Sequence, residues 1–171
     1  KSKDIDIVVD HETLSQLKSK YSLNKNTNLK KYELKSDRFD IDIYVPFFSE
    51  LAVPAQDILK NYIKVNGIKT VSPELLLILK QSAEIERRGT PKGMKDAIDL
   101  LTLLLYSGVD LQKYVAELGK YKLNNYIDAL IRVIKEFDPK DADYVGLDFV
   151  GFRKEQKRLI TLVKQIKSRK L

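Results

Sequence analysis

The sequence predicts an α+β fold in two parts. Residues 1–71 are expected to form a small mixed β-sheet with flanking helices, and residues 72–171 a C-terminal helical bundle. In the first part, polar and apolar residues alternate with the period of two that is typical of strands. In the second part, apolar residues recur every three or four positions, which is typical of helices. The chain has 171 residues, of which 43% are hydrophobic, so it is long enough to bury a core.

The first part is expected to mix short strands with short helices. Asp10 is a helix N-cap candidate, residues 24–28 form an Asn-rich polar turn, and a tight turn at residues 36–37 joins two strands into a hairpin. Asn66-Gly67 is the favoured turn of a second hairpin. The expected strands are residues 5–9, 29–34, 38–45 and the two halves of 62–71, and the expected helices are residues 12–21 and 55–60.

The second part carries helix start and stop signals. Ser72-Pro73 and Thr90-Pro91 each place a capping residue before a proline, and Gly108 can end a helix. Helices are expected from residue 73 and over residues 92–107, 111–118, 123–137 and 153–170, with a loop holding a short element at 138–152. The helical spacing predicts a shared core of Leu75, Leu76, Leu79, Ile98, Leu101, Leu104 and Leu105.

Two of the expected strands carry paired aspartates. Asp4 and Asp6 share one face of the first strand, and Asp40 and Asp42 share one face of a later strand. Carboxylates two residues apart lie ~6.6 Å apart along a strand. Crowded like charges are unfavourable without a cation, and oxygen ligands suit Mg²⁺ or Mn²⁺. The alternative is a sheet with one solvent-exposed face, although aspartate is depleted in strands.

Composition narrows the function classes. The absence of cysteine excludes disulfides and thiolate zinc sites, and the single histidine, His11, makes histidine-based metal ligation improbable. The net charge of +7 suits a polyanionic partner or a nucleotide, or else reflects a solvated lysine-rich surface. No apolar run approaches the ~20 residues of a membrane span, and no signal peptide is recognisable. We therefore expect a cytoplasmic protein without membrane contact.

Several segments together resemble the nucleotidyltransferase superfamily (polymerase-β-like), in particular the branch of minimal nucleotidyltransferases and AbiEii-type toxins. They are residues 3–9 (KDIDIVV), 39–43 (FDIDI), 71–80 (VSPELLLILK), 86–88 (ERR) and 95–100 (KDAIDL). The resemblance implies a metal-dependent enzyme that moves a nucleoside monophosphate from a nucleoside triphosphate to a macromolecular hydroxyl, on tRNA or protein. It also implies a toxin–antitoxin role, with an antitoxin or a second copy of the chain as partner.

The resemblance also suggests roles for residues. Asp4 and Asp6 would bind both metal ions, and Asp42 would bind the acceptor-side ion and help to deprotonate the hydroxyl. Asp40, on the same face, is the alternative third acid and a further metal ligand. The family's Gly-Ser turn lies upstream of the first acid strand, and Ser2 is too close to Asp4 to belong to it. That turn is therefore expected either outside these residues or lost.

Three basic residues of the second part are candidates for binding the triphosphate. They are Lys80, Arg87 and Lys95. Lys80 is equally well explained as a lysine at the core edge, and Lys95 could pair with Asp96 and Asp99 on its own helix. Two alternatives to the enzyme stay open. One is a non-catalytic nucleotide- or partner-binding protein on the same fold, and the other is a basic RNA-binding module.

Overall fold

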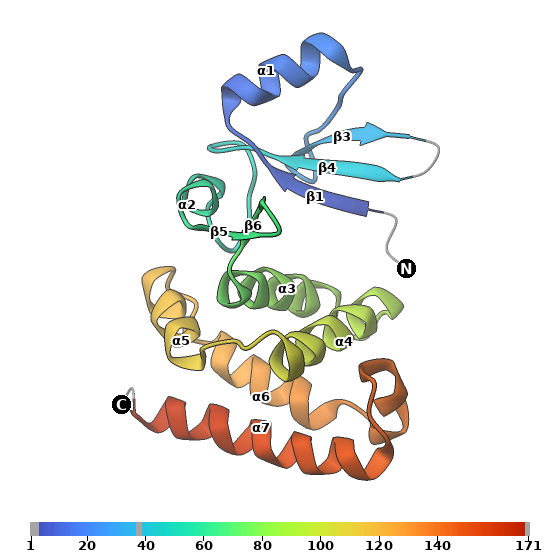
Figure 1. The fold of residues 1–171 in the computed structure, drawn as a ribbon, viewed down its shortest axis with the longest axis vertical. Helices are drawn as coiled ribbons and strands as arrows, with labels where there is room; N and C mark the ends of the chain where they lie inside the picture. Colours follow the sequence, from blue (N-terminus) through green and yellow to red (C-terminus); the bar gives the residue numbers. More distant parts are fainter. Residues whose placement is uncertain (1–3, 37–38, 170–171) are drawn as a thin grey trace. The chain divides into compact units, whose positions relative to one another are not determined.

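A computed structural model describes residues 4–36 and 39–169. The chain forms two compact units, residues 1–72 and 73–171, which are described separately below (Figure 1). The first unit contains strands and two helices, and the second unit is helical. The expected α+β class with a small mixed sheet is confirmed.

The sheet of the first unit has four strands. Its elements are β1 (Asp4–Val8), α1 (His11–Lys20), β2 (Asn24–Asn26), β3 (Lys31–Lys35), β4 (Asp40–Tyr44) and α2 (Ala55–Lys60). The strand order is β1-β4-β3-β2. β1 and β4 run parallel, whereas β4 with β3 and β3 with β2 are antiparallel. The two strands that carry paired aspartates are therefore neighbours.

The core of the first unit lies on the face of this sheet opposite the aspartates. Leu14 from α1 is buried with Tyr32, Ile43 and Val45 from the sheet and its end. Because strand side chains alternate between faces, burial of the even-numbered Tyr32 and the odd-numbered Ile43 leaves the acids on the other face. Asp10 caps α1, since its Oδ1 accepts a hydrogen bond of 2.7 Å from the Thr13 N–H.

One expectation for the first unit is wrong. Residues 24–26 form β2 rather than part of a turn, and the Asn24 and Asn26 side chains each donate to Glu33 at 3.1 Å. Polar cross-strand bonds thus replace the apolar contacts that reveal a strand in sequence. The predicted strand at 29–34 begins two residues later, after Lys30 adopts a φ of 51°. The predicted turn at 36–37 includes a residue outside the described ranges.

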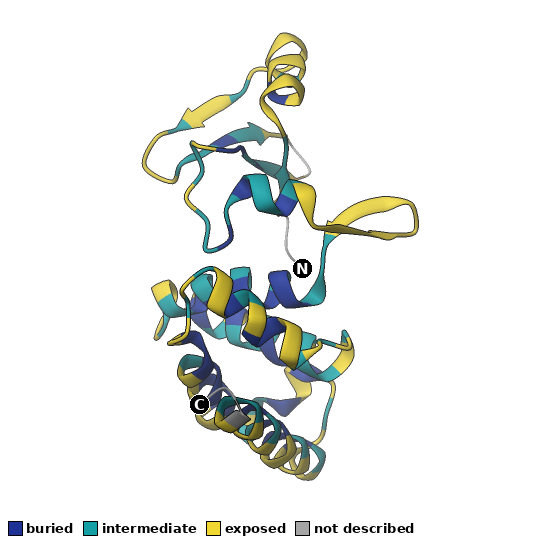
Figure 2. Cartoon of the chain, turned by 90° about the vertical axis from the view of Figure 1, so that its left-hand side faces the viewer, coloured by how far each residue is buried: buried dark blue, intermediate teal, exposed yellow. Residues whose placement is uncertain are grey.

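The predicted second hairpin is confirmed. β5 (Tyr62–Val65) and β6 (Ile68–Val71) pair antiparallel. Asn66 and Gly67 have φ values of 50° and 81°, as the tight turn requires. Both strands are exposed except at Val71, which is half-buried, and Figure 2 shows the hairpin as an exposed loop of chain.

The second unit consists of five α-helices and one 3-10 helix among its described residues, without a strand. They are α3 (Pro73–Arg87), α4 (Pro91–Tyr106), α5 (Leu111–Lys120), α6 (Tyr126–Glu136), η1 (Pro139–Val145) and α7 (Phe149–Arg169). α7 begins four residues before the predicted start at residue 153. Asp148 explains the difference, because its Oδ1 accepts a hydrogen bond of 2.6 Å from the Gly151 N–H.

The predicted leucine core of the second unit is partly right. Leu75 and Leu101 are buried, whereas the other five predicted positions are half-buried. The fully buried positions on these two helices also include Leu77, Ile78 and Leu100. The apolar run at the start of α3 covers more than one helix face, so spacing alone does not select the buried side.

Two buried glutamines link helices of the second unit. Gln81 Oε1 accepts a 2.5 Å bond from the Tyr114 hydroxyl, and its Nε2 donates to the Tyr126 carbonyl. Gln156 Nε2 donates to the Ile134 carbonyl at 2.7 Å, at the C-terminal end of α6. Burial is the main reason that the pKa of Tyr114 lies above its ordinary value. Among the described residues, no helix is both long and apolar enough to cross a bilayer.

Candidate functional site

The candidate site is the polar face of the four-stranded sheet. The parallel register places Asp4 opposite Asp40 and Asp6 opposite Asp42. Paired strands lie ~4.8 Å apart, so the four carboxylates occupy adjacent positions on two neighbouring strands. The adjacency that the metal-site hypothesis requires is therefore present in the backbone.

The neighbouring strand β3 adds further charged side chains to this face. Glu33 lies opposite Asp42 and Lys35 opposite Asp40. A pocket of about 170 Å³ is lined by Asp4, Lys31, Glu33, Lys35, Asp40 and Asp42. The pocket therefore combines four carboxylates with two ammonium groups, all from the first unit.

Lys31 provides a cation within this pocket. Its Nζ lies 2.5 Å from Asp42 Oδ2 and 3.2 Å from Glu33 Oε1. Burial lowers the pKa of Lys31, but the hydrogen bonds and charges of Asp42 and Glu33 outweigh it and leave the pKa above its ordinary value. The ammonium group thus neutralises part of the acidic cluster.

Two other acids of this face have protein partners. Glu33 accepts hydrogen bonds from Asn26, Lys31 and Asn24, which lower its pKa against the opposing effect of burial. Asp6 Oδ1 accepts a hydrogen bond of 3.2 Å from the Tyr44 hydroxyl. Sequence reasoning missed Lys31 and Glu33, although the alternation of residues 31, 33 and 35 would have placed them on a polar face beside the acid strand.

The donor atoms of this face have the right chemistry for Mg²⁺ or Mn²⁺, which prefer carboxylate oxygens. Within residues 4–36 and 39–169, however, no three acidic or histidine side chains converge on one point as metal ligands. Asp42 is directed to Lys31, and Asp6 to Tyr44. A metal bound here by Asp42 would therefore have to replace the Lys31 ammonium group.

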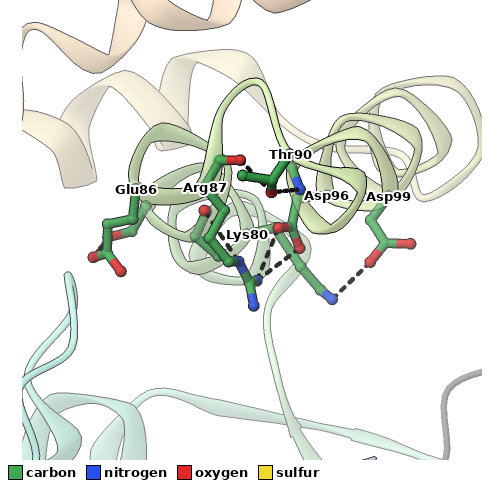
Figure 3. Close-up of polar contacts among 9 residues, drawn as sticks. Lys80, Glu86, Arg87, Thr90, Asp96 and Asp99 are labelled. Atoms are coloured by element: carbon green, nitrogen blue, oxygen red, sulfur yellow. Dashed lines mark hydrogen bonds and ion pairs between the residues drawn. The ribbon is translucent and has the colours of Figure 1, made fainter. Parts of the chain in front are cut away.

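The predicted phosphate-binding residues belong to the second unit. Figure 3 shows Lys80 paired with Asp99, and Arg87 paired with Asp96, across the α3–α4 contact. The Lys80–Asp99 distance is 2.7 Å, and Arg87 Nη2 lies 2.8 Å from Asp96 Oδ2. Both acids pair with α3 rather than with Lys95, which corrects the alternative of pairing within α4. Lys95 is exposed, and the described residues provide no ion pair for it.

Asp96 is the most buried acid of the α3–α4 contact. It is 4% exposed, and this burial raises its pKa, an effect that the Arg87 and Lys80 charges oppose. Thr90 closes the turn between the helices, because its hydroxyl donates to the Arg87 carbonyl at 2.6 Å and accepts from the Gly93 N–H at 3.1 Å. These contacts give the ion pairs a structural role in joining α3 to α4.

Comparison of the chain with protein-family models, with curated protein sequences and with solved structures finds no match.

Proposed function

We propose that the protein is a metal-dependent nucleotidyltransferase. It would transfer a nucleoside monophosphate from a nucleoside triphosphate to a hydroxyl group of a macromolecule, either tRNA or protein. The observation that carries the proposal is the parallel register that sets Asp4 beside Asp40 and Asp6 beside Asp42. The resemblance of the acid strands to the superfamily supports the same activity.

The proposed roles follow from the polar face. Asp4, Asp6 and Asp42 would hold Mg²⁺ or Mn²⁺, with Asp40 as a further ligand. When bound, the metal supplies charge neutralisation for the triphosphate and for the attacking and leaving oxygens. Asp42 would accept the proton of the acceptor hydroxyl after releasing Lys31.

The triphosphate also needs basic partners. Lys80, Arg87 and Lys95 remain our candidates for contacting its phosphates, since ammonium and guanidinium groups are the usual phosphate ligands. For Lys80 and Arg87, this role requires exchange of an aspartate partner for a phosphate. The candidate protein partners remain an antitoxin or a second copy of the chain.

Metal binding is tested by thermal unfolding with and without Mn²⁺. The melting temperature should rise with Mn²⁺, because the site exists only in the folded state. The combined Asp4→Asn and Asp6→Asn variant should lose this rise, while Asp143→Asn, an exposed residue of η1, should keep it. An undiminished rise in the double variant would place any metal site elsewhere.

Activity is tested with nucleoside triphosphates labelled at the α-phosphate, because the monophosphate is transferred and pyrophosphate leaves. RNA and protein fractions serve as acceptors. Asp42→Asn should slow transfer far more than it weakens nucleotide binding, and Asp4→Asn should impair both. Lys80→Ala should mainly weaken nucleotide binding.

The ion pair between Lys31 and Asp42 favours one alternative, a non-catalytic binding protein on this fold. In that case Lys31 would be the permanent cation of the pocket, and nucleotide or a partner would bind without turnover. Tight nucleotide binding without labelling of RNA or protein, with Mg²⁺ and Mn²⁺ and all four nucleotides tried, would favour this alternative.

A further inference from the structure

Most of the excess positive charge of the chain is found in one helix. The 21 residues of α7 contain seven lysines and arginines and a single acid, Glu155, which gives a net charge of +6. The whole chain has a net charge of +7. The remaining residues are therefore almost neutral, and the basic character of the protein is a local property of α7.

The exposed cations of α7 lie on one side of the helix. They are Arg153, Lys154, Lys157, Arg158 and Lys164. Their spacing of three, four and seven residues places them along one stripe, which extends ~16 Å at a rise of 1.5 Å per residue. The opposite side is buried through Phe152, Leu159 and Val163, so packing fixes which side of α7 faces solvent.

Most of this basic stripe lacks a counter-charge. Arg158 pairs with Glu155 at 2.6 Å, on the same helix. For Arg153, Lys154, Lys157 and Lys164, the described part of the chain provides no ion pair. Like charges at neighbouring helix positions repel one another, and a bound polyanion would relieve this repulsion.

Exposed aromatic rings lie at the N-terminal end of the stripe. Phe149 is 51% exposed, and the Arg153 guanidinium carbon lies 5.5 Å from its ring centroid. Tyr144, in the preceding η1, is 69% exposed. Aromatic rings beside cations are the combination by which proteins bind single-stranded nucleic acid, through stacking on bases and contacts to phosphates.

We infer that the exposed side of α7 binds the sugar-phosphate backbone of nucleic acid. The four unpaired cations contact phosphates, and Phe149 stacks on an unpaired base at one end. A membrane surface fits less well, because the apolar side of α7 is buried in the second unit and is not available for insertion. The inference does not depend on the proposed nucleotidyl transfer, since all its residues lie in the helical unit.

The test measures binding of labelled single-stranded RNA, duplex RNA and duplex DNA by fluorescence anisotropy at several KCl concentrations. One variant replaces Arg153, Lys154, Lys157 and Lys164 with glutamine, which keeps helix propensity. A control variant replaces Lys20, Lys92, Lys113 and Lys140 with glutamine, four exposed lysines on other elements. Both variants lose the same charge, and circular dichroism checks that both remain folded.

The parent should bind RNA and DNA, because the phosphate backbone is common to both. Each phosphate contact contributes about 0.7 to 0.9 to the salt slope of log affinity, or about 5- to 8-fold in affinity near 0.1 M salt. With three simultaneous contacts, the α7 variant should bind about 100- to 500-fold more weakly, with a slope smaller by about 2 to 2.7. The control should stay within about threefold of the parent, since distant charges are screened.

Equal weakening in the two variants would overturn the inference, because net charge alone would then explain binding. Binding to vesicles of phosphatidylserine and phosphatidylcholine, without binding to any nucleic acid, would overturn it as well. Phe149→Ala should weaken single-stranded RNA by about 5- to 150-fold, as one stacked base contributes ~1–3 kcal/mol, and should leave duplexes unchanged. An unchanged affinity for single-stranded RNA would refute the stacking role.

Discussion

Replacing Lys31 with methionine tests whether the acidic face is a metal site. Asp42 must release the Lys31 ammonium group before it can bind a metal ion through the same oxygen. A hydrogen bond to a charged group contributes ~1.5–3 kcal/mol. Removal of this competitor should therefore tighten Mn²⁺ binding by about 10- to 150-fold, since each 1.4 kcal/mol changes affinity tenfold.

Isothermal titration of the metal-free protein with Mn²⁺ measures this affinity directly. Lys35→Met is the matched control, because Lys35 lines the same pocket but is exposed and has no ion pair within the described ranges. A single charge ~4 Å away contributes ~1 kcal/mol in water, so the control should tighten binding by no more than about fivefold.

The same variant should also be less stable without metal. Its pocket would hold Asp42 beside Glu33 with no cation between them, and this repulsion should lower the melting temperature. Saturating Mn²⁺ should recover the loss. If Lys31→Met binds Mn²⁺ no more tightly than Lys35→Met, Lys31 does not compete with a metal at Asp42, and the metal-site reasoning fails.

Three further predictions concern stability. Gln81→Leu and Tyr114→Phe should each cost ~1–3 kcal/mol by leaving a buried partner unpaired, whereas the double variant should cost less than either, as urea unfolding of all three will show. Gly93→Ala should destabilise the protein by ~1–3 kcal/mol, although Gly→Ala usually stabilises a helix, because the new Cβ would lie 2.3 Å from the Arg87 carbonyl oxygen; thermal unfolding checks the sign. Glu33 has a lowered folded-state pKa, so its stabilisation is present above its ordinary value of 4.5 and is lost as pH falls through the folded value; Glu33→Gln should flatten the acid limb of the stability curve below that pH.

The sequence predicts the architecture well where local rules apply. The Asn66-Gly67 turn, the Asp10 cap and the change from strand to helix periodicity after Val71 depend on residues close in the chain. β2 was missed because Asn24 and Asn26 stabilise it through Glu33, a distant residue. A strand held by polar cross-strand bonds has no apolar alternation to reveal it.

The candidate site was only partly predictable for a related reason. The paired aspartates are visible as strand residues, but their register depends on tertiary pairing of segments 36 residues apart. The Lys31–Asp42 ion pair depends on which strand adjoins β4. In the second unit, the pairing of Lys80 with Asp99 and of Arg87 with Asp96 likewise required the packing of α3 against α4.

The position of β1 at one end of the strand order has a consequence for aggregation. An edge strand offers unpaired backbone groups to a second copy of the chain, and charged side chains on such a strand discourage this pairing. Asp4 and Asp6 are those charges on β1. If two copies joined through β1, the carboxylates of both would crowd together, and self-association would be opposed at neutral pH. The aspartates thus protect the sheet edge whatever they bind, and asparagine variants made to test metal binding should be checked for self-association by light scattering.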